Sequence, residues 1–129
     1  MNKGIDFVKL DTTLMDLPTL KSYRFGEIDY KTEILIGIGF VFDGETFSLS
    51  PNAQRNWDSI KTSKADYTFP LNVSTIDNNV YSLTNPNVQA FWVAARDALK
   101  NHLDSGRILK KAIFDAIDIP AVDAVIDNR

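Results

Sequence analysis

His102 is the single histidine in the sequence, and its imidazole could act as a proton acceptor or a metal ligand near neutral pH. Neither role has the neighbours it needs, because the sequence contains no cysteine and no carboxylate stands at a spacing typical of a metal or catalytic pair. The residue also falls among the apolar positions of a predicted helix. We therefore interpret His102 as a partly buried structural residue.

Four aspartates could be taken for a cation site: Asp115, Asp118, Asp123 and Asp127. They lack the alternating acids and the glycine of a calcium loop, and acids near a helix start commonly complement the helix dipole. Gly37 and Gly39 could admit a phosphate, but they lie within a predicted strand and no third glycine follows. We interpret them as bulge or close-packing positions, and we expect no metal and no cofactor.

A stripe of basic residues on the long predicted helix is the remaining candidate for a charged ligand: Arg96, Lys100, Arg107 and Lys111. Asp97 and Asp104 border this stripe, which favours a solvated face. The net charge of −3 provides no cationic field to attract nucleic acid. Hydrolase, kinase and nucleotide-binding motifs are absent. We expect a protein that is not an enzyme, binds no nucleic acid and has other proteins as partners.

The composition is that of an ordinary globular protein, with 44% hydrophobic and 24% charged residues. A chain of 129 residues can bury a hydrophobic core as one domain. No apolar run approaches the roughly 20 residues of a membrane-spanning helix, and the first residues do not resemble a secretory signal. The lack of cysteine agrees with a reducing compartment. We expect synthesis in a cytoplasm and no contact with a membrane.

The longest pattern predicts one helix from Asn85 to Ile117. Its apolar positions recur every three or four residues on one face: Val88, Phe91, Trp92, Ala95, Leu99, His102, Leu103, Gly106, Leu109, Ile113 and Ile117. The pattern does not shift at Gly106, which predicts a close backbone contact there. A helix of this length spans about 48 Å, more than the diameter of a compact chain of this size. Its apolar face should therefore meet the N-terminal segment or another subunit.

Two similar modules precede and include the start of this helix. Asp43-Gly44 separates the apolar runs 34–42 and 45–49, which predicts a hairpin with a type I′ turn. Ser50 and Pro51 then start a helix that runs to about residue 64. Residues 77–92 repeat residues 43–57, with Trp92 in the place of Trp57. We predict an α+β fold in which two ββα repeats form a small antiparallel sheet packed on helices, with one long C-terminal helix.

Residues 1–22 have no consistent period, so we predict an extended N-terminal arm followed by a single ββαββα domain, residues 23–129, that ends in a short helix. The predicted partner-binding residues are apolar side chains of the arm and two that lie off the main stripe of the long helix: Phe7, Leu10, Leu14, Leu17, Ile108 and Phe114. The predicted structural core contains Phe42, Trp57, Trp92, Leu99 and His102.

Two motifs carry a resemblance to a known family. The first is Gly39-Phe40-x-Phe42-Asp43-Gly44-x-x-Phe47-Ser48-Leu49-Ser50 with Ala53-Gln54-x-x-Trp57, and the second is Ala98-x-x-x-His102-Leu103-Asp104-Ser105-Gly106-Arg107-x-Leu109-Lys110-x-Ala112-Ile113. With these motifs, residues 38–117 resemble an uncharacterised domain family of bacteriophage tail, baseplate and tail-fibre proteins. Residues 1–37 have no counterpart in that family.

The resemblance implies a structural or assembly component of a tailed bacteriophage virion, in the tail, baseplate or fibre attachment, that acts through protein-protein contacts. It implies other phage structural proteins as partners, a homo-oligomer as a further arrangement, and a place in the virion after synthesis in the host cytoplasm. Two alternatives stay open, a tail-fibre assembly factor absent from the mature particle and a small ligand-binding module. The family assigns no catalytic or binding residue.

Overall fold

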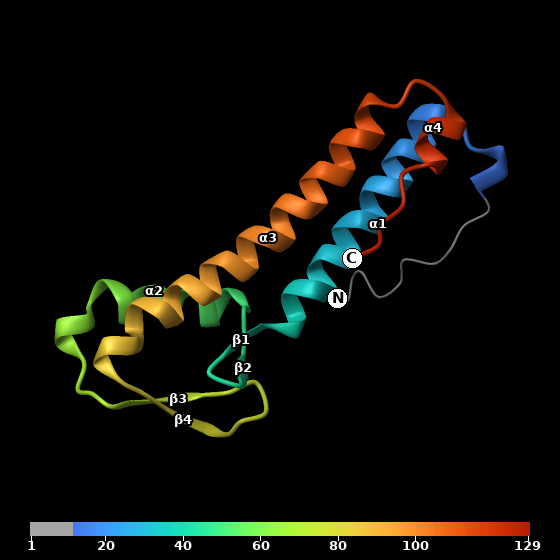
Figure 1. The fold of residues 1–129 in the computed structure, drawn as a ribbon. Helices are drawn as coiled ribbons and strands as arrows, with labels where there is room; N and C mark the ends of the chain where they lie inside the picture. The colour runs from blue at the N-terminus through green and yellow to red at the C-terminus, as the bar shows by residue number, and fades with distance from the viewer. Residues whose placement is uncertain (1–11) are drawn as a thin grey trace. The chain divides into compact units, whose positions relative to one another are not determined.

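The computed structural model describes residues 12–129 and has an α+β fold, as the sequence predicts. Its contacts divide these residues into two compact units. The hairpin unit comprises residues 35–101, and the helical unit comprises the described residues up to 34 together with residues 102–129. Two long helices, α1 (Leu17–Ile38) and α3 (Val88–Asp115), contribute residues to both units (Figure 1).

The hairpin unit contains the two predicted ββα repeats. The first consists of β1 (Phe40–Phe42), β2 (Glu45–Phe47) and α2 (Pro51–Thr62), and the second of β3 (Leu71–Ser74), β4 (Val80–Leu83) and the start of α3. Short 3-10 turns, Lys64–Asp66 and Asn85–Asn87, lie between the modules and before α3, and a third, Thr12–Leu14, precedes α1. Each hairpin forms its own two-stranded antiparallel sheet.

The two hairpins do not form the expected common sheet, and among the described residues one backbone hydrogen bond joins them. The Ile76 amide donates to the Thr46 carbonyl at 2.8 Å, but no ladder continues from this contact because the chain leaves β2 for α2 after Phe47. The turn chemistry is as predicted. Asp43 and Gly44 both have positive φ, 52° and 76°, and the Ser50 hydroxyl accepts from the Ala53 amide at the start of α2.

An aromatic cluster forms the core of the hairpin unit. The ring of Phe91 lies 5.0 Å from those of Phe47 and Trp57 and 5.2 Å from that of Phe40, each in an edge-to-face arrangement. Such pairs add to the free energy gained from burying the rings themselves. The indole N–H of Trp57 donates to the Ser48 carbonyl at 2.8 Å. Trp57 is therefore buried with its polar group satisfied.

Trp92 differs from the core role expected of it. It is only partly buried, and its indole N–H donates to the Asp58 carboxylate at 2.8 Å. Phe91 is 2% exposed and occupies the central position instead. The packing of α3 determines which of its residues points inward. An equivalent position in the two repeats does not determine it. Phe42 and Leu99 pack partly buried against the core, and His102 is also partly buried.

Helix α1 replaces the last part of the predicted arm. Residues 17–22 are helical, so the predicted domain boundary between residues 22 and 23 falls inside α1. The Asp16 carboxylate accepts from the Thr19 amide at 3.0 Å and thereby caps the helix. A hydrogen bond from the Thr19 side chain and, after it, the one from the Thr19 amide lower the pKa of Asp16. Pro18 occupies an early helical position, where its missing N–H has no helical partner. Asp16 and Pro18 are the sequence signal for the start of this helix, and the prediction of an extended arm does not use that signal.

Helix α1 also continues through residues 34–38, where the β-branched run predicts a strand. Ile34 and Ile38 are exposed in this helix and Ile36 packs partly buried against the hairpin core, so the β-branched composition of the run did not decide its secondary structure. Gly39 ends the helix with φ +91°, and a Cβ there would lie 2.2 Å from the Phe47 carbonyl oxygen. The interpretation of Gly39 as a close-packing position is confirmed, although at a helix end and not within a strand. Gly37 lies inside α1 in open space.

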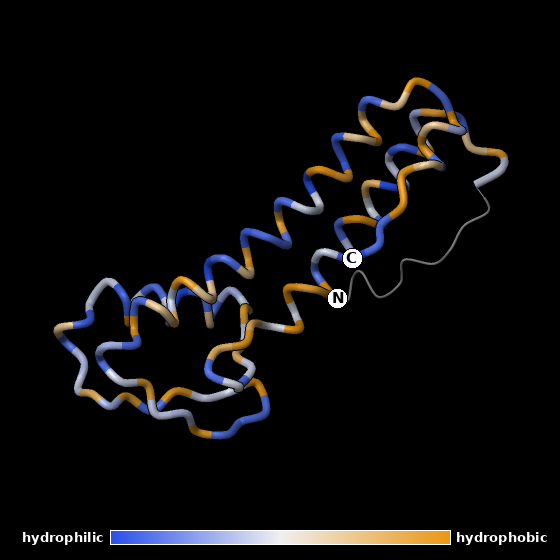
Figure 2. The backbone as a smooth tube through the Cα atoms, viewed as in Figure 1, coloured by the Kyte–Doolittle hydropathy of each residue, from blue (hydrophilic) through white to orange (hydrophobic). Residues whose placement is uncertain are grey.

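The helical unit has a smaller, aliphatic core. Its buried residues come from α1, α3 and the short helix α4 (Ile119–Asp123), and they are Leu20, Ile28, Ile113 and Val122. Figure 2 shows hydrophobic and hydrophilic residues alternating along α3, as its amphipathic pattern requires. The close contact predicted at Gly106 is present, because a Cβ there would lie 2.7 Å from the Thr32 hydroxyl oxygen.

Candidate functional site

The four aspartates that could suggest a cation site do not converge. Each one has its own partner: Asp115 pairs with Lys111 (2.7 Å), Asp118 accepts from the Ala121 amide (2.9 Å), Asp123 pairs with Arg24 (3.3 Å) and Asp127 pairs with Arg129 (2.7 Å). Within residues 12–129 no group of three potential metal ligands is found. The arrangement gives a divalent cation no shared site among these residues.

All four basic residues of the α3 stripe, Lys100 included, are exposed, and three of them have ion pairs: Arg96 pairs with Asp58 at 4.0 Å, and two pair within α3. Arg107 pairs with Asp104, and Lys111 pairs with Asp115. Arg96 lies over the ring of Trp92, with 5.6 Å between guanidinium and ring centroid. These side chains form a solvated, mixed-charge surface, in line with the interpretation from the sequence.

The predicted partner-binding residues occupy different environments. Phe7 and Leu10 lie outside the described residues. Leu14 is 92% exposed, whereas Leu17 packs partly buried against the helical core. Ile108 and Phe114 are 69% and 67% exposed, but they are six positions apart on α3 and therefore about 120° apart around it. The structure does not bring these residues into one continuous stripe.

Phe114 lines a depression of the helical unit. A shallow groove of about 490 Å³ is lined by Phe25, Asp29, Arg107, Lys110, Lys111 and Phe114. Lys110 pairs with Asp29 at 2.8 Å across its rim. The Lys21 ammonium donates to the Phe114 carbonyl at 2.8 Å and lies 5.9 Å from the centroid of its ring. Aromatic side chains are enriched in protein interfaces, so the exposed ring of Phe114 is the candidate anchor of this surface. We call this surface the Phe114 face.

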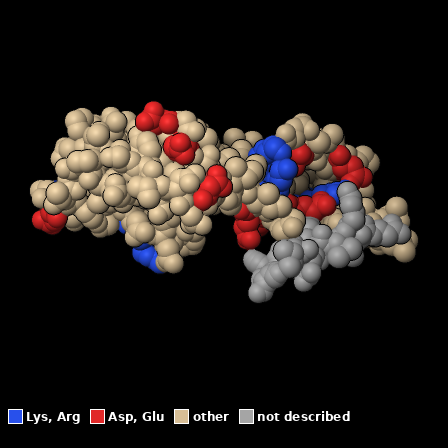
Figure 3. Space-filling model, turned by 90° about the horizontal axis from the view of Figure 1, so that it is seen from below, with Lys and Arg blue, Asp and Glu red and all other residues tan. Residues whose placement is uncertain are grey.

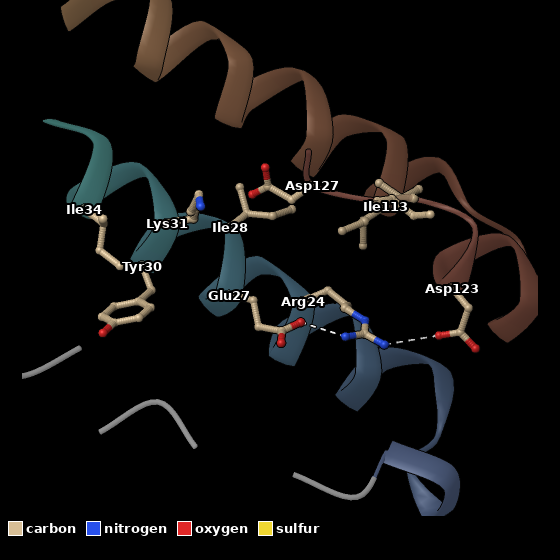
Figure 4. A pocket seen from close by; sticks show the side chains of 11 residues that line it. Arg24, Glu27, Ile28, Tyr30, Lys31, Ile34, Ile113, Asp123 and Asp127 are labelled. Atoms are coloured by element: carbon tan, nitrogen blue, oxygen red, sulfur yellow. Dashed lines mark hydrogen bonds and ion pairs between the residues drawn. The ribbon is translucent and has the colours of Figure 1, made fainter. Parts of the chain in front are cut away.

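A second depression of the helical unit is already occupied by internal ion pairs. It has a volume of about 510 Å³ and lies between α1 and the segment after α3. Figure 4 shows Arg24 between Glu27 and Asp123, with hydrogen bonds of 2.7 Å and 3.3 Å to their carboxylates. The bond to Glu27 is the main cause that raises the pKa of Arg24. The guanidinium therefore serves the fold and is not left to hold a ligand.

Arg129 forms a polar clasp beside Gly106. Its guanidinium donates to the Thr32 hydroxyl (2.8 Å), the Ser105 hydroxyl (3.2 Å), the Ile28 carbonyl (3.1 Å) and both oxygens of the Asp127 carboxylate (2.8 and 2.7 Å). The hydrogen bond from Arg129 is the main cause that lowers the pKa of Asp127. No sequence pattern could identify this cluster, because Arg129 and Thr32 are 97 positions apart.

A depression of the hairpin unit has no acid or base among its lining residues. It has a volume of about 670 Å³ and lies between α2 and β3, and we call it the β3 groove. Buried apolar residues, among them Ala53, Trp57 and Val73, form its base. Leu71 and Ile76 also line the groove, and its other lining residues are polar: Ser48, Ser50, Asn52, Asn56, Tyr67, Asn72, Ser74, Thr75 and Asn78. Figure 3 shows that the hairpin unit presents few charged side chains on the face that carries the strands. Sequence reasoning did not identify this groove.

Comparison with family models, with curated proteins and with solved structures gave no match for this chain. Among the described residues, none of the helices is both long enough and apolar enough to cross a lipid bilayer.

Proposed function

We propose that this chain is a structural or assembly component of a tailed bacteriophage virion, in the tail, baseplate or fibre attachment. It acts through protein-protein contacts, with other phage structural proteins as partners and with copies of itself as a further arrangement. The phage assignment is supported by the motifs between Gly39 and Ile113 described above. The chain is made in the host cytoplasm and resides in the virion.

The observation that carries a protein-binding function is the Phe114 face. Phe114 exposes two thirds of a large aromatic side chain next to Phe25, and the surrounding lysines can keep their charged ends in water while their stems cover apolar surface. Removing such a ring from water on docking supplies free energy that a polar surface cannot. Repetition of this contact over many copies in a particle would strengthen a modest single contact.

The two alternatives differ in where the protein is found. A tail-fibre assembly factor occurs in the lysate of infected cells and is lost from mature particles. A small ligand-binding module binds its ligand without either association. The charged side chains Arg24, Lys110 and Arg129 pair with acids of the same unit, which gives no support to a charged ligand for the ligand-binding alternative.

Quantitative mass spectrometry of purified particles and of the matching lysate tests the proposal. A virion component is present in particles at a fixed ratio to the major tail protein across preparations. Its absence from particles, with the protein abundant in the lysate, would favour the assembly factor. Absence from particles together with no complex in the lysate would overturn both phage roles.

A further inference from the structure

We propose that the β3 groove binds an extended, uncharged peptide segment of a partner protein, which pairs with the free edge of β3 as an added strand. This inference goes beyond the proposed function and does not depend on it, because it rests on the backbone of residues 71–76 and on the residues that line the groove. Either proposal can therefore fail while the other stands.

The register of the second hairpin shows which backbone groups of β3 are free. The Thr75 amide donates to the Asn79 carbonyl at 2.8 Å, and in the same register Val73 faces Tyr81 and Leu71 faces Leu83. In an antiparallel pair, hydrogen-bonded residues alternate with residues whose N–H and C=O point away from the partner strand. The N–H and C=O of Asn72 and Ser74 therefore point away from β4.

Nothing in the described part of the chain pairs with these groups. Within residues 12–129 no hydrogen bond joins the backbone of Asn72 or Ser74 to any group outside the second hairpin. The next residue of the same orientation, Ile76, donates to the Thr46 carbonyl. This edge is therefore already paired at one end by another strand. Beyond Phe47 the first hairpin turns into α2 and leaves the rest of the edge open.

The groove lies along this open edge. All four residues of β3 line it, although Leu71 and Val73 point to one side of the strand and Asn72 and Ser74 to the other. Side chains from the two opposite faces of a strand can line the same depression when that depression runs along the edge of the strand. The β3 groove therefore follows the edge of β3. Helix α2 forms the opposite wall through Asn52, Asn56 and Ile60.

These features select the occupant. An extended peptide presents N–H and C=O groups at every second residue, and this spacing matches the free groups of Asn72 and Ser74. Strand addition supplies affinity through the backbone, while the walls select side chains. The lining contains neutral polar residues and apolar ones, such as Ile60, Leu71 and Ile76, but no acid or base. A segment with uncharged side chains therefore fits, and a charged one would lose solvation without gaining a partner.

The probe is a displayed library of random peptides, each about ten residues long, which is enough for one strand, followed by the recovered sequences as synthetic peptides. We expect uncharged sequences that bind more tightly than about 0.1 mM. On binding, amide hydrogen exchange of Asn72 and Ser74, measured by NMR, should slow at least about tenfold. The amides of Leu71 and Val73 should exchange slowly with or without the peptide.

Proline variants provide a matched pair, because Asn72 and Ser82 face each other in the register and both N–H groups point away from the hairpin. Asn72→Pro removes a donor inside the groove, whereas Ser82→Pro removes one at the far edge of β4. We expect Asn72→Pro to weaken peptide binding roughly fivefold or more and Ser82→Pro to leave it unchanged. Should Asn72→Pro fail to fold, the exchange measurement on the unaltered chain decides.

Four results would overturn the inference. The first is that Asn72 and Ser74 amides exchange as slowly as those of Leu71 and Val73 without any peptide. The second is that no library peptide binds more tightly than about 1 mM. The third is equal loss of binding in both proline variants. The fourth is that a panel of neutral oligosaccharides, or a second copy of this chain, occupies the groove while the recovered peptides bind elsewhere.

Discussion

The two units reach a buried core by different means. The hairpin unit clusters aromatic rings, with Phe91 in contact with Phe47 and Trp57, and places polar groups at its surface. The helical unit has an aliphatic core and adds a partly buried cationic side chain, Arg129, whose hydrogen bonds cross between α1 and α3. A hydrogen-bond network requires all its partners in place, because a buried polar group that a substitution leaves without a partner keeps its desolvation cost. The helical unit should therefore be the more sensitive to small, conservative substitutions.

The largest expected effect is on the aromatic core. Phe91→Ala should lower the free energy of unfolding by about 3–5 kcal/mol, the range for truncation of a buried aromatic ring. Trp92→Ala should lower it by about 1–2 kcal/mol, because Trp92 is partly buried and loses one hydrogen bond to Asp58. Urea denaturation followed by circular dichroism measures both. Equal losses for these adjacent residues would contradict the assignment of Phe91 as the central side chain.

The second effect tests the close contact of the helical unit. Gly106→Ala should destabilise the protein by about 1–3 kcal/mol, since the new methyl group would lie 2.7 Å from the Thr32 hydroxyl oxygen. Gly37→Ala is the matched control, because it is also helical but has no atom within 4 Å of the added group. That control should be neutral or stabilise by up to about 1 kcal/mol. A stabilising Gly106→Ala variant would mean that the two helices are not held this closely.

The third effect concerns the clasp. Arg129→Lys keeps the charge but loses the planar fork that contacts Asp127 and Thr32 at once, and we expect a loss of about 1–3 kcal/mol. Arg107→Lys provides the comparison, since Arg107 is an exposed partner of Asp104 and exposed pairs contribute about 0.2–1 kcal/mol at most. Thermal unfolding of the two variants should therefore differ in midpoint. Identical midpoints would show that the clasp contributes no more than a surface ion pair.

The smallest effect is a pH dependence that arises in the clasp. Arg129 lowers the pKa of Asp127 in the folded state, so its contribution to stability is complete above the unfolded value of about 3.9 and is lost as the pH falls through the lower folded value. Asp127→Asn should reduce the loss of stability in this acidic range. Denaturant titrations at pH values from about 5 downward measure it. If the stability of the Asp127→Asn variant fell at acidic pH as steeply as that of the unaltered protein, the coupling between Asp127 and Arg129 would be contradicted.

The same contrast explains what could be predicted from the sequence. Local patterns predicted three elements correctly. They are the hairpin turn at Asp43-Gly44, the helix start at Ser50-Pro51 and the apolar stripe of α3. Helix α1 was missed because its buried residues, such as Leu20 and Ile28, stand among apolar residues on its other faces. The exposed Phe114 was predicted from its position off the stripe of α3. The clasp and the β3 groove depend on which distant segments meet, and no local pattern records that.

Incorporation of single variants into purified particles tests most directly whether the Phe114 face makes the contact. Phe114→Ser and Val41→Ser remove side chains of nearly equal exposure, 67% and 66%, from the helical and the hairpin unit. We predict that Phe114→Ser lowers the amount of the protein per particle at least about tenfold, a loss of about 1.4 kcal/mol in each contact, while Val41→Ser leaves it unchanged. Normal incorporation of a folded Phe114→Ser protein, or equal loss for both variants, would contradict the account.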